Sequence, residues 1–248
     1  LDLDAARAGV DTLDLSYLTS GLTWRADYVA LLSRDEKRLS LTGLVTLSND
    51  SGTSYDDARL QLVAGNVNVA APSMKTLQTI TTARVAAAPA QENYFEYHLY
   101  TMPRAASILN KQTKQLTLLS ARSVPVTKTL ELRGNSSYYR NETPDLGTRL
   151  PIGVYLTFTN AGGDLGVPLP AGVVRVYEDD SRGLAQFVGS DTIDHTPKNE
   201  TVRLHLGDSF DVTASKRQTD YHIVSNCESR SSYEIRIANA KPVTQDVL

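Results

Sequence analysis

Residues 152–178 read IGVYLTFTNAGGDLGVPLPAGVVRVYE, and this stretch decides the fold class. Its first half alternates apolar and polar side chains with the two-residue period of a strand that buries one face. Asn160 and the glycines after it supply turn chemistry, and Pro168 and Pro170 exclude a central ladder strand. A second strand follows at residues 173–177. We therefore predict two strands of a sandwich sheet joined by an ordered, proline-stiffened loop.

Other segments repeat this period, with turn residues about every 8–12 residues, as β-sandwiches require. Residues 38–48 (RLSLTGLVTLS) alternate throughout, and Gly43 is a candidate β-bulge. Residues 93–102 (NYFEYHLYTM) predict another strand, and Trp24 is predicted to anchor the core. The predicted fold class is all-β, with antiparallel β-sandwich sheets arranged in two β-rich subdomains.

Composition and turn signals divide the chain into consecutive parts. Residues 1–12 are a linker or the tail of a preceding helix. Residues 13–133 form the first β-rich subdomain, in which residues 70–91 lack aromatic side chains and are predicted to be a mobile loop. Residues 134–150 are rich in turn residues and are the predicted linker. Residues 151–248 are the predicted second β-sandwich subdomain.

The overall composition excludes several classes of protein. Of 248 residues, 41% are hydrophobic and 21% charged, and the net charge is −3. This charge provides no basic surface of the kind that binds nucleic acid. No apolar run approaches the roughly 20 residues of a membrane-spanning helix. Cys227 is the single cysteine, so the chain has no internal disulfide.

The predicted strand at residues 93–102 carries the candidate binding surface. Side chains two residues apart share one face of a strand. The residues that would share this face are Tyr94, Glu96, His98 and Tyr100. Aromatic rings with a polar tip are common at interfaces, so we predict a binding role for this face. A metal shared by Glu96 and His98 is an alternative, but zinc sites normally need three or four protein ligands.

Three acidic residues follow the second strand of the opening stretch. Glu178, Asp179 and Asp180 offer the carboxylate oxygens that calcium prefers and are the candidate metal ligands. Their spacing matches no EF-hand loop, and turn chemistry also accounts for them. The sequence contains no nucleophile elbow and no phosphate-binding glycine motif. We therefore predict no catalytic residue and no cofactor.

Several stretches occur in an order that resembles a known family. They are SGLTWRADYVALL, LTGLVTLSNDSGTSYDDARLQLVAGNV, FEYHLY, KQTKQLTLLSA, LGVPLPAGVVRVYEDD and LHLGDSFDV. Together they resemble a bacterial domain-of-unknown-function family that forms the C-terminal portion of mucoidy-inhibitor-like proteins. The resemblance covers about residues 13–247. It implies a β-rich fold, an envelope or periplasmic setting and further strands past Leu248, and it implies no catalytic residues.

These observations favour a non-enzymatic module of the bacterial envelope, periplasmic or secreted. We expect it to bind or scaffold a protein or surface-polymer partner, without nucleic acid and without a membrane-spanning segment in this chain. The alternative is a hydrolase that acts on surface polysaccharide or peptidoglycan through carboxylates brought together by the fold.

Overall fold

The computed structural model describes residues 15–65, 91–94, 97–102, 104–135, 138, 141–162 and 164–248. The prediction of an all-β fold is confirmed, because the protein is nearly all β with several antiparallel sheets. The predicted tail at residues 1–12 lies outside the described residues. So does the predicted mobile loop at residues 70–91, except for its last residue, Gln91.

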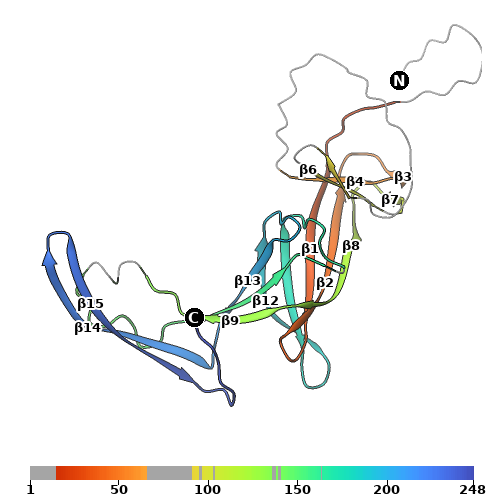
Figure 1. Cartoon of the computed structure of the whole chain (residues 1–248). Coiled ribbons are helices and arrows are strands. Elements are labelled where there is room, and N and C mark those ends of the chain that lie inside the picture. Colours follow the sequence, from red (N-terminus) through yellow and green to blue (C-terminus); the bar gives the residue numbers. More distant parts are fainter. Residues whose placement is uncertain are drawn as a thin grey trace, which may run out of the picture.

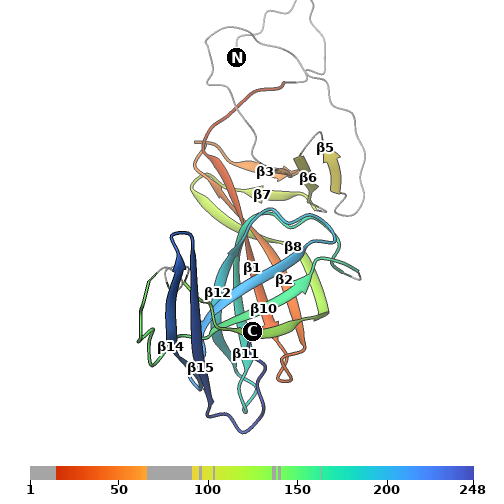
Figure 2. The ribbon, with the colours of Figure 1, turned by 60° about the vertical axis from the view of Figure 1, so that its left-hand side comes forward.

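Two sheets form the central sandwich (Figures 1 and 2). The larger sheet has the order β12-β11-β1-β2-β8. Its strands are β1 (Leu22–Leu32), β2 (Arg38–Asn49), β8 (Gln112–Pro125), β11 (Gly172–Asp179) and β12 (Ala185–Ile193). The smaller sheet has the order β13-β10-β9. Its strands are β9 (Thr127–Glu131), β10 (Gly153–Thr159) and β13 (Thr201–Asp208). The main core includes Tyr28 from the larger sheet and Leu156 and Leu204 from the smaller one, all fully buried.

The alternation predicted for residues 38–48 is confirmed in β2. Leu39, Leu41, Val45 and Leu47 are buried, while Arg38 and Ser40 are exposed. The bulge predicted at Gly43 is wrong, because β2 pairs with β1 without interruption there. The register of β2 against β8 does shift after Gly43, but the extra residue, Leu118, belongs to β8. The hydrophobic alternation alone was therefore sufficient to orient this strand.

The two strands of the opening stretch lie in different sheets, so the prediction that they share one sheet is wrong. β10 pairs with β9 and β13, whereas β11 pairs with β12 and runs parallel to β1. The parallel pair begins where Gly172 lies opposite Ala26. A Cβ atom on Gly172 would come within 2.3 Å of the Ala26 carbonyl oxygen, so this close approach requires glycine. The loop at residues 160–171 thus connects the two layers of the sandwich.

A smaller β-region covers one end of the larger sheet (Figure 1). It consists of the pair β3 (Tyr55–Ala58) and β7 (Ala106–Ile108) and of the sheet β4-β6-β5, with β4 (Gln61–Ala64), β5 (Gln91–Tyr94) and β6 (Tyr97–Thr101). Leu62, Tyr100 and Ile108 pack there against Val45 and Leu47 of β2. Trp24 is half-buried and contacts both this core and the main one.

Residues 93–102 are not one strand, because β5 and β6 pair antiparallel with Tyr94 opposite Tyr97. The chain therefore reverses direction in the middle of the predicted strand. Both halves favour the β conformation, and the two-residue period of such a run does not distinguish a long strand from a tight hairpin. Glu96 lies outside the described residues.

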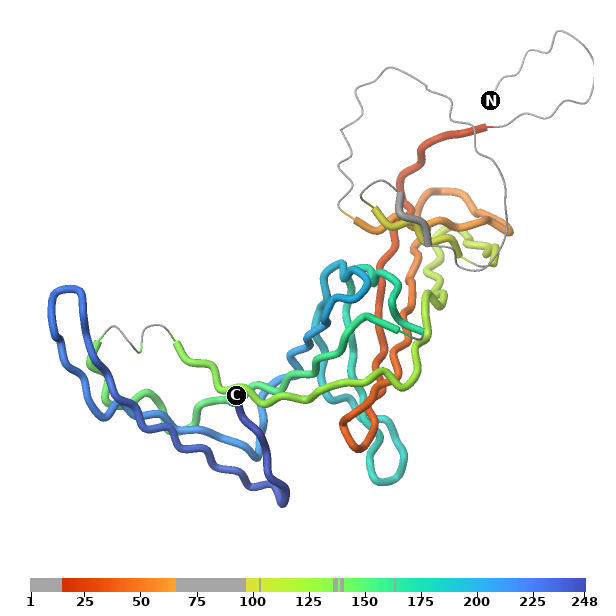
Figure 3. Tube along the Cα trace, viewed as in Figure 1, coloured from red at the N-terminus to blue at the C-terminus, as the bar shows by residue number. Residues whose placement is uncertain are grey.

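β14 (Val212–Ser225) and β15 (Glu228–Asn239) form a long hairpin. Its base joins a third core that contains Leu130, Ile152, Val212 and Ala214. From there the hairpin extends away from the sandwich, as the blue strands in Figures 1 and 3 show.

The predicted boundary at residues 134–150 does not separate two subdomains. β11 and β12 follow it in sequence, yet they complete the sheet that contains β1, β2 and β8. The described part of this segment is also not a free linker. The Leu146 and Leu150 N–H groups donate to the Lys216 and Ala214 carbonyls of β14, at 3.2 and 2.8 Å. Residues 145–150 therefore run along the edge of β14 and are bonded to it by isolated bridges.

Candidate functional site

The hairpin changes from buried to exposed along its length. At its base Val212 and Ala214 are buried, as the alternating pattern of a packed strand requires. Near its tip Ile223 is 74% exposed and Val224 is 51% exposed. Contiguous exposed apolar patches mark surfaces that contact other molecules, so these two side chains are candidate anchors of such a surface.

Between base and tip, buried polar side chains fix the hairpin to Tyr138 and to residues 141–143. The Lys216 side chain is buried with its Nζ 4.8 Å from the centre of the Tyr138 ring and 4.6 Å from that of Tyr233. This geometry stabilises a buried ammonium group by cation–π attraction. The Tyr233 hydroxyl donates to the Tyr138 carbonyl at 2.7 Å. The Gln218 side-chain oxygen accepts the Thr143 N–H at 2.6 Å.

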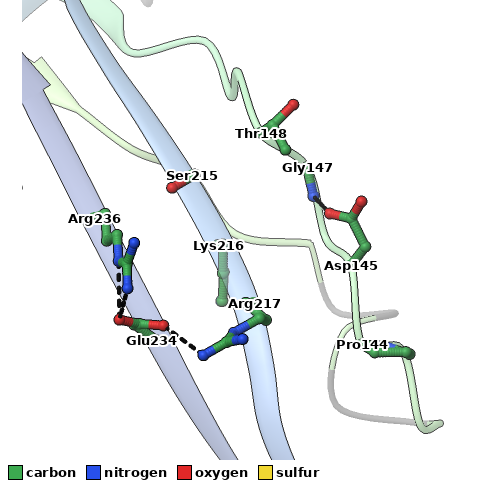
Figure 4. Close-up of a pocket in the computed structure, with 9 residues that line it drawn as sticks. All are labelled: Pro144, Asp145, Gly147, Thr148, Ser215, Lys216, Arg217, Glu234 and Arg236. Atoms are coloured by element: carbon green, nitrogen blue, oxygen red, sulfur yellow. Dashed lines mark hydrogen bonds and ion pairs between the residues drawn. The ribbon is translucent and has the colours of Figure 1, made fainter.

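A groove of about 450 Å³ lies between residues 144–148 and the hairpin. Figure 4 shows residues 144–148 on one side and side chains of β14 and β15 on the other. The lining residues are Pro144, Asp145, Gly147, Thr148, Ser215, Lys216, Arg217, Glu234 and Arg236. Strand register explains the second wall, because Ser215 lies opposite Arg236 and Arg217 lies opposite Glu234.

Glu234 is held between two arginines in this groove (Figure 4). Its carboxylate accepts from Arg236 Nη2 at 2.7 Å and from Arg217 Nη2 at 2.9 Å. The hydrogen bond from Arg236, followed by the charges of both arginines, lowers the pKa of the Glu234 carboxyl. Each guanidinium has five N–H donors, so donors remain beyond these contacts. The groove can therefore bind a carboxylate or phosphate group.

A second cavity, of about 190 Å³, brings together two carboxylates that are distant in sequence. It is lined by Glu36, Lys128, Glu178 and Lys241 and by apolar side chains that include Leu32 and Phe210. Burial, and next the Glu36 charge, raise the pKa of the Glu178 carboxyl. Glu36 is paired with Lys128. Ligand pockets usually measure roughly 300–1,000 Å³, so this cavity is small for a saccharide substrate.

The fold divides the predicted binding face between two paired strands, and one of its members is buried. Tyr94 ends β5, whereas His98 and Tyr100 belong to β6. Tyr100 is buried, and its hydroxyl donates to the Pro168 carbonyl at 2.7 Å. Burial raises the pKa of this hydroxyl far above its usual value. Tyr100 is therefore a core residue that holds the proline-containing loop.

The predicted acidic metal site does not form. Glu178 faces the second cavity, while Asp180 closes the turn between β11 and β12 by accepting the Arg182 and Leu184 N–H groups at 2.8 and 3.0 Å. The Leu184 N–H is the main cause of the lowered pKa of Asp180. Within the described part of the chain, no three His, Cys, Asp or Glu side chains lie close enough together to hold a metal ion.

Sequence reasoning missed the residues that build the groove and its support. Val212, Ala214, Lys216 and Gln218 continue one two-residue period, and the change from apolar to polar along it was the available signal. A buried lysine at such a position requires partners. Those partners, Tyr138 and Tyr233, are 95 residues apart in sequence, and only the fold brings them together.

Comparison with known proteins found no family model, no curated protein and no solved structure that matches this chain. In the described residues, no helix is long and apolar enough to cross a membrane.

Proposed function

We propose that the chain is a non-enzymatic binding module of the bacterial envelope, periplasmic or secreted. It binds or scaffolds a protein or a surface polymer through the β14–β15 hairpin. The order of stretches that resembles the mucoidy-inhibitor-like family supports the setting. The hairpin supports the activity, because binding surfaces combine exposed apolar anchors with a polar rim.

The observation that carries this proposal is the contrast between the two ends of one hairpin. The base is packed in a core, the middle is fixed by Lys216, Gln218 and two tyrosines, and the tip presents Ile223 and Val224 to solvent. Such rigid support lowers the entropy cost of binding at the tip and in the adjacent groove. The arginines of the groove favour a partner with carboxylate or phosphate groups.

The test is binding of the purified chain to an envelope membrane fraction and, separately, to purified peptidoglycan and surface polysaccharide. We compare the natural chain with an Ile223→Ser/Val224→Ser variant and with Arg217→Glu. Binding that both variants reduce supports the proposal, and the fraction that retains the chain identifies the partner class. Undiminished binding by both variants, or no binding to any fraction, would contradict it. Leu184→Ser, on the β11–β12 turn, is the matched control for an exposed apolar side chain.

The hydrolase alternative has one favourable observation, the raised pKa of Glu178 beside Glu36. A carboxyl with a raised pKa can act as a general acid opposite a second carboxylate. The ion pair of Glu36 with Lys128 and the small cavity argue against this role. Release of soluble fragments from peptidoglycan or polysaccharide, abolished by Glu178→Gln, would establish the hydrolase.

A further inference from the structure

The outer edge of β15 has no neighbouring strand among the described residues. The sheet contains only β14 and β15, and residues 145–150 bond to the far edge of β14. β15 is therefore an edge strand of 12 residues that stands away from the sandwich (Figure 1). Its pairing with β14 is interrupted by two extra residues on the β14 side only, so β15 itself stays regular. Long regular edges favour pairing with another strand.

Along one face of β15, positions equally far from Ser232 on its two sides carry charges of opposite sign. Glu228 and Arg230 precede Ser232, and Glu234 and Arg236 follow it at the same spacings. When a strand pairs antiparallel with its own copy about a twofold axis at Ser232, each residue meets the residue equally far on the other side. Arg230 then meets Glu234 of the second copy, and Glu228 meets Arg236. Opposite charges directly across an antiparallel pair stabilise it.

Neighbouring registers are unfavourable, which makes this one specific. An axis at Ser231 would place Glu228 opposite Glu234 of the second copy. An axis at Tyr233 would place Arg230 opposite Arg236. Like charges directly opposite one another destabilise a strand pair, so the charge pattern selects the register centred on Ser232.

The opposite face of β15 pairs small side chains with large ones in the same register. Ser229 meets Ile235 of the second copy, and Ser231 meets Tyr233. Within one chain Ser229 lies opposite Ile223 of β14, so Ile235 of the second copy would share a row with exposed Ile223. Both Ile223 and Ile235 are more than half exposed in the single chain. Self-pairing therefore covers part of the exposed apolar surface of the hairpin.

We propose that β15 docks a second copy of this chain, antiparallel about a twofold axis at Ser232, to form one continuous four-stranded sheet from two hairpins. A contact along residues 228–236 alone is smaller than a standard interface of about 1,600 Å². The dimer is therefore weak and concentration-dependent. Because the ion pairs lie at the surface, raised salt weakens it. This proposal does not depend on the envelope partner and is tested on the purified chain alone.

Sedimentation of the full chain over a concentration series is the first test. The natural chain shows a monomer–dimer equilibrium, and Arg230→Glu raises the dimer dissociation constant at least about tenfold, since it places like charges across both symmetric contacts. Arg182→Glu is the matched control, because its side chain is 75% exposed against 76% for Arg230. It leaves the equilibrium unchanged. A chain that stays monomeric, or that dimerises equally well with Arg230→Glu, overturns the proposal.

Charge complementation gives a second, independent test. A Glu228→Arg/Glu234→Arg variant and an Arg230→Glu/Arg236→Glu variant are each monomeric, and an equimolar mixture forms the heterodimer. Ser232→Cys in a Cys227→Ser background crosslinks under oxidation, because directly opposed Cα atoms lie about 4.5–5.5 Å apart. Ser229→Cys in the same background does not, since it faces Ile235 of the second copy. Crosslinking at Ser229 but not at Ser232 indicates another register and overturns the proposal.

Discussion

The loop at residues 160–171 and the β14–β15 hairpin both lead away from the sandwich strands, but they differ in how far their side chains are buried. In the loop Leu165, Pro168, Leu169 and Pro170 are buried. In the outer half of the hairpin nearly every side chain is exposed. A connection that returns to the core contributes to stability, whereas one that leaves the core is free to contact a partner.

The loop is anchored from two cores at once. Tyr28 of the main core donates its hydroxyl to the Pro170 carbonyl at 2.7 Å, and Tyr100 of the smaller core donates to the Pro168 carbonyl at the same distance. Leu169 exchanges backbone hydrogen bonds with Thr196. The loop therefore links the two layers of the sandwich with the β-region at its end. The following predictions test whether stability depends on the loop and not on the hairpin tip.

The largest expected effect is that of Leu169→Asp. Leu169 is 1% exposed in the main core, so the substitution buries a carboxylate that gains no partner there. We expect a loss of at least about 4 kcal/mol in the free energy of unfolding, a large part of the roughly 5–15 kcal/mol of a typical domain. Urea unfolding measures it. Leu184→Asp, at an exposed position, serves as the control and changes stability by less than about 0.5 kcal/mol. Equal stability of the two variants would show that the loop is not part of the core.

Asn160→Ala should have the next largest effect. The buried Asn160 side chain donates to the Val167 and Pro197 carbonyls and accepts the Gly166 N–H. Its removal leaves buried backbone groups unpaired, at a cost of about 2–3 kcal/mol. Asn239 ends β15 with a similar local pattern but is exposed, so Asn239→Ala should cost less than about 0.5 kcal/mol. Thermal unfolding measures both variants. Equal losses of stability for Asn160→Ala and Asn239→Ala would show that burial does not distinguish the two side chains.

Tyr100→Phe removes a single hydroxyl from the loop anchor. It leaves the Pro168 carbonyl without this buried donor, so we expect a loss of about 1–2 kcal/mol. The matched change in the hairpin is Tyr233→Phe, which also removes a hydroxyl that donates to a carbonyl. Tyr233 is only half-buried, so water can replace its hydroxyl and the loss should be smaller. Chemical denaturation of both variants compares them directly, and a larger loss for Tyr233→Phe would be inconsistent with the anchoring role of Tyr100.

The strands that sequence predicted correctly are those with one buried face along their whole length. β2 is the example, because Leu39, Leu41, Val45 and Leu47 all meet the core. The tertiary pairing was not predictable in the same way. Nothing local to Gly172 indicates that it lies within contact of Ala26, because that parallel pairing joins segments nearly 150 residues apart, and the expected boundary at 134–150 failed for the same reason.

The candidate site was less predictable than the fold. Tyr100 was chosen for its aromatic alternation, but alternation reports which residues share a face and not whether that face meets solvent. The hairpin arginines and Glu234 are ordinary surface residues in sequence. Their significance depends on register, which places Arg217 opposite Glu234 and leaves β15 at the edge of its sheet.

Replacement of the loop prolines should have a small effect. Pro168→Ala and Pro170→Ala each give the unfolded chain more conformational freedom, at a cost of about 0.4–1 kcal/mol. The fold keeps both carbonyls that accept the tyrosine hydroxyls, so hydrogen bonding is retained. Urea unfolding of the single and double variants measures the losses. Losses that exceed those of Tyr100→Phe would mean that the proline rings act mainly through packing.

The smallest expected effect on stability is at the hairpin tip. Ile223 is 74% exposed and contributes little buried area, so Ile223→Ser should change the free energy of unfolding by less than about 0.5 kcal/mol. Removal of its apolar surface should nevertheless weaken partner binding, because exposed apolar side chains contribute chiefly when another molecule covers them. Thermal unfolding and envelope binding of the same variant separate the two roles. An Ile223→Ser variant that unfolds at a lower temperature but binds normally would show that Ile223 stabilises the fold and does not contact the partner. The hairpin tip would then resemble the loop in its role.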